Sequence, residues 1–134
     1  MNNYTNLLRE HNLKATPQRL AIIDIIETHG HINIDTLYEE VKKRFNSISL
    51  ATIYKNINSM IDNLLLAEVK LPNRKSVYEV IKSEHSHLLC KDCGRVIDIE
   101  IDTSHMVKDI SLKYNFDING SDVVLFGRCG SCRK

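Results

Sequence analysis

The pattern of apolar and polar positions changes its period partway along this chain. In the first half, apolar residues recur at helical spacing, as Ile53, Ile57 and Ile61 do every four residues. Thr16 and Ser49 each precede such a stripe, in the position of a side chain that caps a helix N-terminus. The pattern predicts four helices, over residues 4–11, 17–28, 33 or 35 to 45, and 50–64.

From residue 67 onward, the apolar positions alternate, which is the period of a β-strand. Two alternating stretches, 67–71 and 76–80, flank a basic turn at residues 72–75 and predict a hairpin. Asp102 or Thr103 is placed to cap one further helix, which runs to residue 114. The remaining strands are expected over residues 87–90, 96–101 and 123–129.

Two of the predicted helices are joined by a short polar turn at residues 46–48, an arrangement typical of a helix-turn-helix. The second helix begins with side chains that suit contacts with phosphates and base edges in a major groove. These side chains are Ser49, Thr52, Tyr54, Lys55 and Asn56. Alternatively, these side chains form only a solvated face of the helix, and the hairpin over residues 67–80 is an ordinary surface hairpin. The helix pair and the wing-like hairpin together favour DNA binding.

The sequence therefore predicts an α+β protein with two domains. Residues 1–80 are expected to form an N-terminal winged helix-turn-helix domain, and residues 81–134 a small C-terminal α/β domain. The junction near residues 79–83 has almost no linker and is the expected hinge.

Four cysteines, the only ones in the chain, form two C-x-x-C pairs: Cys90 with Cys93, and Cys129 with Cys132. Together they make a complete tetrahedral thiolate set for a structural zinc ion. The 35 residues between the pairs exceed the spacing of a compact zinc ribbon, so zinc is expected to join distant segments. Disulfides or redox motifs are the alternatives. The N-terminus lacks the apolar core of a signal peptide, so we expect a reducing compartment in which the thiols stay available for metal.

The composition narrows the possible partners. A content of 6% aromatic residues, without tryptophan, argues against a stacking platform for single-stranded nucleic acid. The formal net charge of +1 does not by itself indicate nucleic-acid binding. No apolar run approaches the length of a membrane span, so we expect a cytoplasmic protein with no membrane partner.

Three motifs in order give the chain a resemblance, over essentially its full length, to the ferric uptake regulator family of bacterial metal-dependent repressors. The motifs are residues 14–19, residues 49–56, and His85-x-His87-x-x-Cys90-x-x-Cys93 followed by the C-terminal cysteine pair. The resemblance implies a C-terminal dimerisation domain, a homodimer on palindromic double-stranded operator DNA, and no enzymatic activity. It implies DNA contacts by Lys14, Arg19, Ser49, Thr52, Tyr54, Lys55 and Asn56.

The resemblance also implies a regulatory metal site that draws on both domains. The matching positions are His31, Glu79, His85, His87 and Asp98. Imidazoles and carboxylates suit Fe2+ or Mn2+, whereas the cysteines suit structural Zn2+. A metal held by both domains can fix the angle between them. The other histidines, His11, His29 and His105, match no motif and are expected on the surface.

Several positions bear on the branch of the family. Iron-uptake regulators usually have His-His-Asp-His at residues 84–87 and a histidine near residues 120–121; this chain has neither. Asp98 resembles the peroxide-stress regulators, whereas Glu79 resembles the iron regulators. The balance favours a repressor released by peroxide through metal-catalysed oxidation of His31 or His85. The alternatives are an iron-uptake or zinc-uptake regulator.

Two hypotheses from other classes also apply to the histidine cluster. A metalloenzyme would need a general base beside an open metal position, and no such constellation is recognisable. A zinc-stabilised protein-interaction module would have purely structural histidines and metal-independent DNA affinity.

Overall fold

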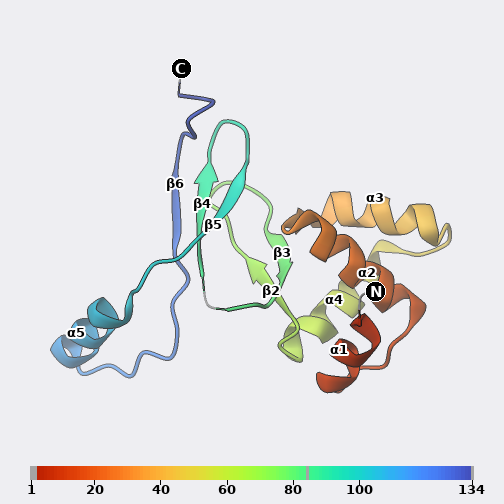
Figure 1. Ribbon diagram of the computed structural model, residues 1–134, viewed down its shortest axis with the longest axis horizontal. Coiled ribbons are helices and arrows are strands. Elements are labelled where there is room, and N and C mark those ends of the chain that lie inside the picture. The colour runs from red at the N-terminus through yellow and green to blue at the C-terminus, as the bar shows by residue number, and fades with distance from the viewer. Residues whose placement is uncertain (1–2, 84, 134) are drawn as a thin grey trace. The chain divides into compact units, whose positions relative to one another are not determined.

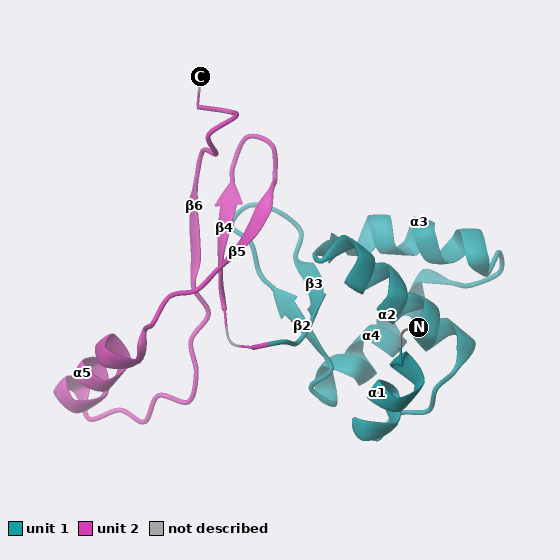
Figure 2. Ribbon diagram, viewed as in Figure 1, with its two compact units in different colours: residues 1–82 teal, residues 83–134 magenta. Residues whose placement is uncertain are grey.

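The computed structural model describes residues 3–83 and 85–133 of the 134-residue chain. Glu84, the first of residues 84–87 that were compared with the iron-uptake regulators, lies outside the described residues. The order of helices and strands is shown in Figure 1. The chain divides into two compact units, Met1–Lys82 and Ser83–Lys134 (Figure 2).

The first unit contains the four helices that the sequence predicts. They are α1 (Tyr4–Glu10), α2 (Pro17–His29), α3 (Ile34–Arg44) and α4 (Leu50–Asp62). Side chains of Thr16, Asn33 and Ser49 accept hydrogen bonds from first-turn amides and so begin α2, α3 and α4. Helix α4 ends two residues earlier than expected. The Asn63 side chain donates to the Ser59 carbonyl, and Leu64 adopts a left-handed backbone with φ of 62°.

A three-stranded antiparallel sheet with the order β1-β3-β2 completes the first unit. Its strands are β1 (Ile32–Asn33), β2 (Leu66–Val69) and β3 (Val77–Val80). The hairpin of β2 and β3 confirms the predicted wing, with slightly shorter strands. Strand β1 was not predicted, because two residues are too few to show alternation. Its register pairs Ile32 with Tyr78.

The core of the first unit lies where the helices pack on one another and on the sheet. Its largest fully buried side chains are Leu8, Ile22, Ile23, Ile26, Leu37, Val41, Ile53, Ile57, Met60, Leu65 and Leu66. In the expected α4 stripe, Ile53 and Ile57 are fully buried and Ile61 packs against the core while half-buried. Met60, which was not named in the stripe, is fully buried as well. Helices α3 and α4 with the hairpin confirm the winged helix-turn-helix and the α+β class.

The second unit is a small three-stranded sheet with one helix. Its elements are β4 (Ser86–Cys90), β5 (Val96–Ile99), α5 (Ser104–Tyr114) and β6 (Val124–Gly127). The sheet order is β5-β4-β6, with β5 antiparallel and β6 parallel to β4 (Figure 1). Strands β5 and β6 are shorter than the sequence predicted. The last strand ends where the Gly127 carbonyl accepts from the Lys91 amide.

Little apolar surface is buried in the second unit. Among its described residues, Leu89 and Cys90 are the buried apolar side chains. The exposed large apolar residues are Ile101, Met106, Ile110, Leu112, Tyr114, Phe116, Leu125 and Phe126. A unit of this size with so small a core needs a further source of stability, such as metal or a partner. None of the helices in the described part of the chain could span a membrane.

Candidate metal centres and nucleic-acid interface

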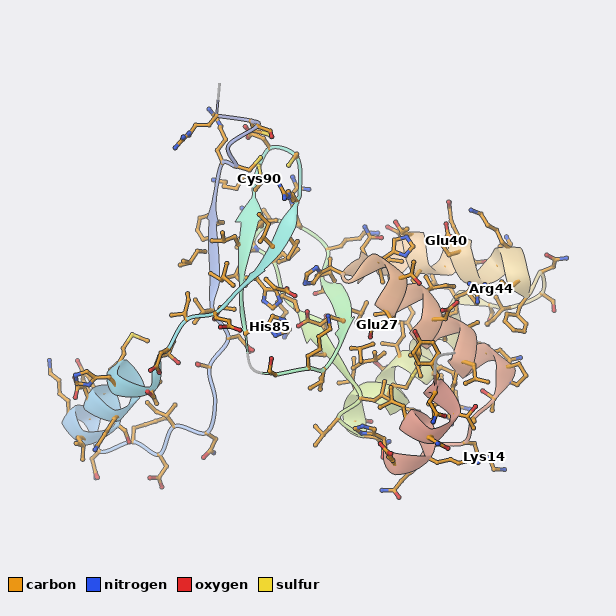
Figure 3. All side chains as sticks on the ribbon, viewed as in Figure 1. Lys14, Glu27, Glu40, Arg44, His85 and Cys90 are labelled. Carbon is orange, nitrogen blue, oxygen red and sulfur yellow. The ribbon has the colours of Figure 1, made fainter. Side chains whose placement is uncertain are left out.

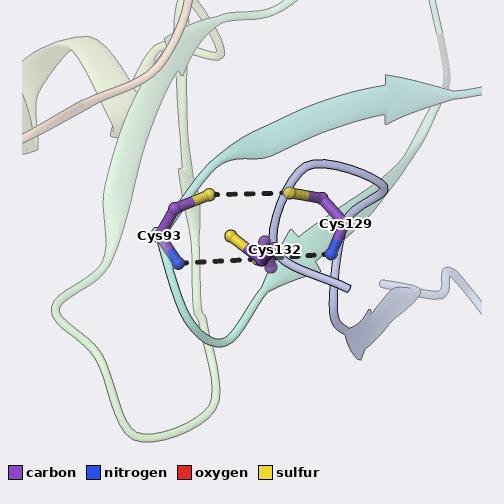
Figure 4. Close-up of side chains that lie close together, drawn as sticks. Cys93, Cys129 and Cys132 are labelled. Carbon is purple, nitrogen blue, oxygen red and sulfur yellow. Dashed lines mark hydrogen bonds between the residues drawn. The ribbon is translucent and has the colours of Figure 1, made fainter. Parts of the chain in front are cut away.

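The four cysteines lie together at one end of the second sheet. Cys90 ends β4, Cys93 lies in the turn before β5, and Cys129 and Cys132 follow β6. All four sulfur atoms lie within 4.8 Å of one another. The Cys93 and Cys129 sulfurs are 3.9 Å apart (Figure 4). Zinc–sulfur bonds of about 2.3 Å in a tetrahedron put the sulfurs about 3.8 Å apart, so this set can hold zinc.

The parallel pairing of β6 with β4 brings the two cysteine pairs together. It places Gly127 opposite Cys90, and Cys129 follows two residues later. Two contacts join the segments independently of the sulfurs. The Lys91 amide donates to the Gly127 carbonyl at 2.7 Å, and Arg128 Nε donates to Asp92 Oδ2 at 2.7 Å. The metal site is therefore partly assembled by the polypeptide itself.

Hydrogen bonds within the cluster make the thiols unequal. The backbone amides of Cys93 and Cys129 donate to Cys90 Sγ at 3.5 and 3.3 Å, and they lower the pKa of Cys90 to about 6. The hydrogen bonds that Cys132 shares with Cys129 and Cys90 raise its pKa to about 12. A metal bound by all four sulfurs requires each of these thiols to give up its proton.

In the first unit, His31 and Glu79 form a pair. His31 precedes β1, and Glu79 lies in β3, so the antiparallel register that matches Ile32 with Tyr78 puts the two side by side. His31 Nε2 lies 3.1 Å from Glu79 Oε2. Glu79 is only 6% exposed, and a buried carboxylate needs a charged or hydrogen-bonding partner. We call these two residues the His31–Glu79 pair.

In the second unit, His85, His87 and Asp98 form a cluster. The β4–β5 register places His87 opposite Asp98, and His85 lies two residues before His87 on the same side. The Nε2 atoms of both histidines are 3.5 Å from Asp98 Oδ1, and the ring centroids are 4.6 Å apart. His85 Nδ1 lies 2.9 Å from the Ser83 carbonyl. A histidine held by Nδ1–H in this way presents Nε2 as a metal ligand.

The five residues expected to bind a regulatory metal thus fall into two groups, one in each unit. Within the second unit, Figure 3 shows His85 immediately before β4 and Cys90 at the end of that strand. The His85–His87–Asp98 cluster and the cysteine cluster are therefore at opposite ends of one strand. Their donor types also differ, since the cysteines supply soft thiolates and the other set supplies imidazoles and carboxylates.

The residues expected to contact DNA lie in the first unit. Tyr54 is 38% exposed on α4, and Lys14 and Lys55 are also exposed. Ser49 and Thr52 share a hydrogen bond of 2.9 Å at the start of α4.

Arg19 and Asn56, expected as separate DNA contacts, are bonded to each other. Arg19 Nε donates to Asn56 Oδ1 at 3.1 Å. No local pattern predicted this contact, because the two residues are 37 positions apart.

Two further polar contacts were not apparent in the sequence. Lys75 at the wing tip forms an ion pair with Asp35 at the start of α3. The expectation that His11 is a surface residue was wrong: it is half-buried, and its Nδ1 lies 2.9 Å from the Asn63 carbonyl. Both contacts join segments far apart in the chain, so no local signal could have revealed them. His29 and His105 are exposed, as expected.

Comparison with known proteins agrees with these features. The model of the ferric uptake regulator family matches residues 10–126. The ferric uptake regulation protein of Vibrio cholerae is 32% identical over 98% of this chain and 90% of its own length. A peroxide-responsive repressor of Staphylococcus epidermidis is 28% identical over 95% of this chain and 86% of its own length.

The crystal structure of the Campylobacter jejuni peroxide stress regulator is similar to this one with a TM-score of 0.73. The two sequences are 36% identical, and the match covers 98% of this chain and 100% of the Campylobacter jejuni chain. The match of sequence, fold and motif order shows that the chain belongs to the ferric uptake regulator family of metal-dependent transcriptional regulators.

Proposed function

We propose that this protein is a metal-dependent repressor that binds double-stranded operator DNA as a homodimer and leaves it when peroxide oxidises a metal-binding histidine. The observation that carries the proposal is the division of the candidate ligands between the two units. The His31–Glu79 pair offers two ligand side chains, and the His85–His87–Asp98 cluster offers three. An ion bound by ligands from both groups would restrict the angle between the DNA-binding unit and the second unit.

Two different metals suit the two donor sets. The closed set of Cys90, Cys93, Cys129 and Cys132 is suited to structural Zn2+. The imidazole and carboxylate set is suited to Fe2+ or Mn2+ as the regulatory ion. A regulatory ion that binds the DNA-competent arrangement more tightly shifts the population toward it, and DNA binding then favours metal binding in return.

The same two units support the proposed partners. Helix α4 is the proposed recognition helix, with Tyr54 and Lys55 exposed for the major groove. The exposed apolar residues of α5 and β6 are the proposed surface for a second copy of the chain. A two-fold dimer presents two such helices, which fits a palindromic operator. Such a repressor acts in the cytoplasm and has no catalytic turnover on a substrate.

Peroxide release rests on the histidines. Fe2+ held by these ligands would lend electrons to hydrogen peroxide, which Mn2+ does not readily do. One peroxide oxygen would enter an imidazole C–H bond of His31 or His85 to give C–OH, and the other would leave as water. The imidazole supplies the two electrons overall, so the iron would end as Fe2+. The oxidised ring is a poorer ligand, so metal affinity falls and the DNA-competent arrangement loses support. The 36% identity to the Campylobacter jejuni peroxide stress regulator supports this branch.

An iron-sensing repressor is the second candidate. The 32% identity to the Vibrio cholerae ferric uptake regulation protein and the presence of Glu79 favour it. The two candidates differ in one respect. An iron sensor binds DNA according to iron supply, and its histidines stay unmodified at low peroxide. In a peroxide sensor, one metal-binding histidine is oxidised.

The deciding experiment measures operator binding by fluorescence anisotropy for the Fe2+ and Mn2+ proteins, before and after low-dose peroxide. We expect release only from the Fe2+ protein, with one added oxygen on a peptide containing His31 or His85 by mass spectrometry. Asp98→Glu should blunt the response while metal-dependent DNA binding remains. Release with cysteine oxidation, zinc loss and intact histidines would refute the mechanism. Continued binding with unmodified histidines would favour the iron sensor.

A further inference from the structure

Arg19 joins three segments of the first unit. It lies in the first turn of α2, where its amide donates to Thr16 Oγ1 at 3.3 Å. Its Nη1 donates to the Lys14 carbonyl at 3.1 Å, and its Nε donates to Asn56 Oδ1 in α4 at 3.1 Å. One guanidinium therefore connects the loop before α2 to the proposed recognition helix.

Both the oxygen and the nitrogen of the Asn56 side-chain amide form hydrogen bonds within the protein. Its Nδ2 donates to the Thr52 carbonyl at 3.1 Å, one turn earlier in α4. This bond requires the oxygen, rather than the nitrogen, to face Arg19. An asparagine that reads adenine uses its oxygen and its nitrogen together. Because both are already engaged, Asn56 is better suited to hold Arg19 than to read a base.

The Lys14 segment is fixed by the same contacts. The Lys14 carbonyl accepts from the Thr16 amide at 3.1 Å as well as from Arg19. The Lys14 side chain itself is exposed. The backbone that carries Lys14 is thus fastened to α4 through Arg19, while its ammonium group remains available for DNA.

We propose that Arg19 is a positioning residue for DNA recognition rather than a phosphate contact. Its guanidinium holds the Lys14 loop at a fixed place against α4, so that Lys14 and the α4 side chains meet one DNA site together. This inference rests on the proposed DNA-binding function. A lysine at position 19 keeps the charge but cannot reproduce a planar fork that serves two acceptors in different directions.

Charge-conserving and charge-removing variants separate the two roles. We would measure operator and random-DNA affinity over a range of salt for Arg19→Lys, Arg19→Gln and Asn56→Ala. As a positioning residue, Arg19→Lys should weaken operator binding by about tenfold, with little effect on random DNA and an unchanged salt slope. If Arg19 only neutralises a phosphate, Arg19→Lys should bind normally, and Arg19→Gln should lower the slope by about one for every sequence.

A double variant and a control complete the binding test. The double variant Arg19→Gln with Asn56→Ala should bind operator within about twofold of the weaker single variant, because each change alone already removes the same hydrogen bond between Arg19 and Asn56. Additive losses would overturn the proposal. Arg44→Gln is the matched control: it removes one cation and its ion pair with Asp24 in the same unit, away from Lys14 (Figure 3). It should leave the operator preference unchanged.

Hydrogen–deuterium exchange tests the connection without DNA. In the free full-length protein, Arg19→Gln and Arg19→Lys should speed exchange in residues 12–16, including the Thr16 amide, and Arg44→Gln should not. Unchanged exchange in both Arg19 variants would overturn the inference whatever the DNA result. Faster exchange in a protein that binds no operator with any metal would leave the connection standing and refute the proposed function instead.

Discussion

Loss of one zinc thiolate should destabilise the second unit far more than a neighbouring surface change. The metal would join Cys93 to Cys129, which lie 36 positions apart. A cross-link across a loop of that length removes chain entropy from the unfolded state worth about 4 kcal/mol. The second unit has little apolar core to offset the loss, since Leu89 and Cys90 are its buried apolar residues among those described. Cys132→Ser leaves three thiolates and should release the zinc, and the second unit should then be strongly destabilised.

The assay is urea unfolding followed by circular dichroism, together with a measurement of bound zinc. At a slope of roughly 1–3 kcal/mol per molar urea, the lost entropy corresponds to a midpoint lowered by roughly 1–4 M. Ser131→Ala is the matched control, because residue 131 is exposed and lies between Cys129 and Cys132. It should keep both zinc and midpoint. A strong chelator should give the wild-type protein the behaviour of Cys132→Ser.

Two outcomes would contradict this reasoning. A Cys132→Ser protein with one tightly held zinc per chain and a wild-type midpoint would show that the cysteines are not the zinc site. Zinc loss without a change in midpoint would show that contacts such as Arg128 with Asp92 hold the segments together without metal.

Three further outcomes are expected. Tyr54→Ala should lower the preference for operator over random DNA in anisotropy titrations, because the proposed base contact would be lost; equal weakening of both would exclude direct readout. Asp35→Asn should release Lys75 from its exposed ion pair and steepen the salt slope of DNA binding by up to about one, with little effect on the urea midpoint; an unchanged slope would contradict this. Asp102→Asn should destabilise α5 at neutral pH but not in acid. Hydrogen bonds from the Ser104 hydroxyl and amide lower the pKa of Asp102. The ionised Asp102 therefore stabilises the folded protein above about pH 4, and this stabilisation is lost as pH falls through the folded pKa. A difference in urea midpoint that does not depend on pH would refute this.

Local chemistry made much of the first unit predictable. Helical spacing with the caps Thr16 and Ser49 correctly predicted the starts of α2 and α4. The alternating stretches around residues 72–75 correctly predicted the wing hairpin. These features depend on residues within a few positions of one another, which is why the sequence alone determined them. The two C-x-x-C pairs likewise determined a complete ligand set, although not how its halves meet.

Only the tertiary structure decided the contacts between distant segments. The parallel pairing of β6 with β4 brings Cys129 to Cys90, and the pairing of β1 with β3 brings His31 to Glu79. The bond between Arg19 and Asn56 crosses from α2 to α4. Each of these contacts depends on how whole elements pack and on the register of their pairing. Neither the period of the sequence nor its capping residues encodes that packing, because both report only on the nearest turn or strand.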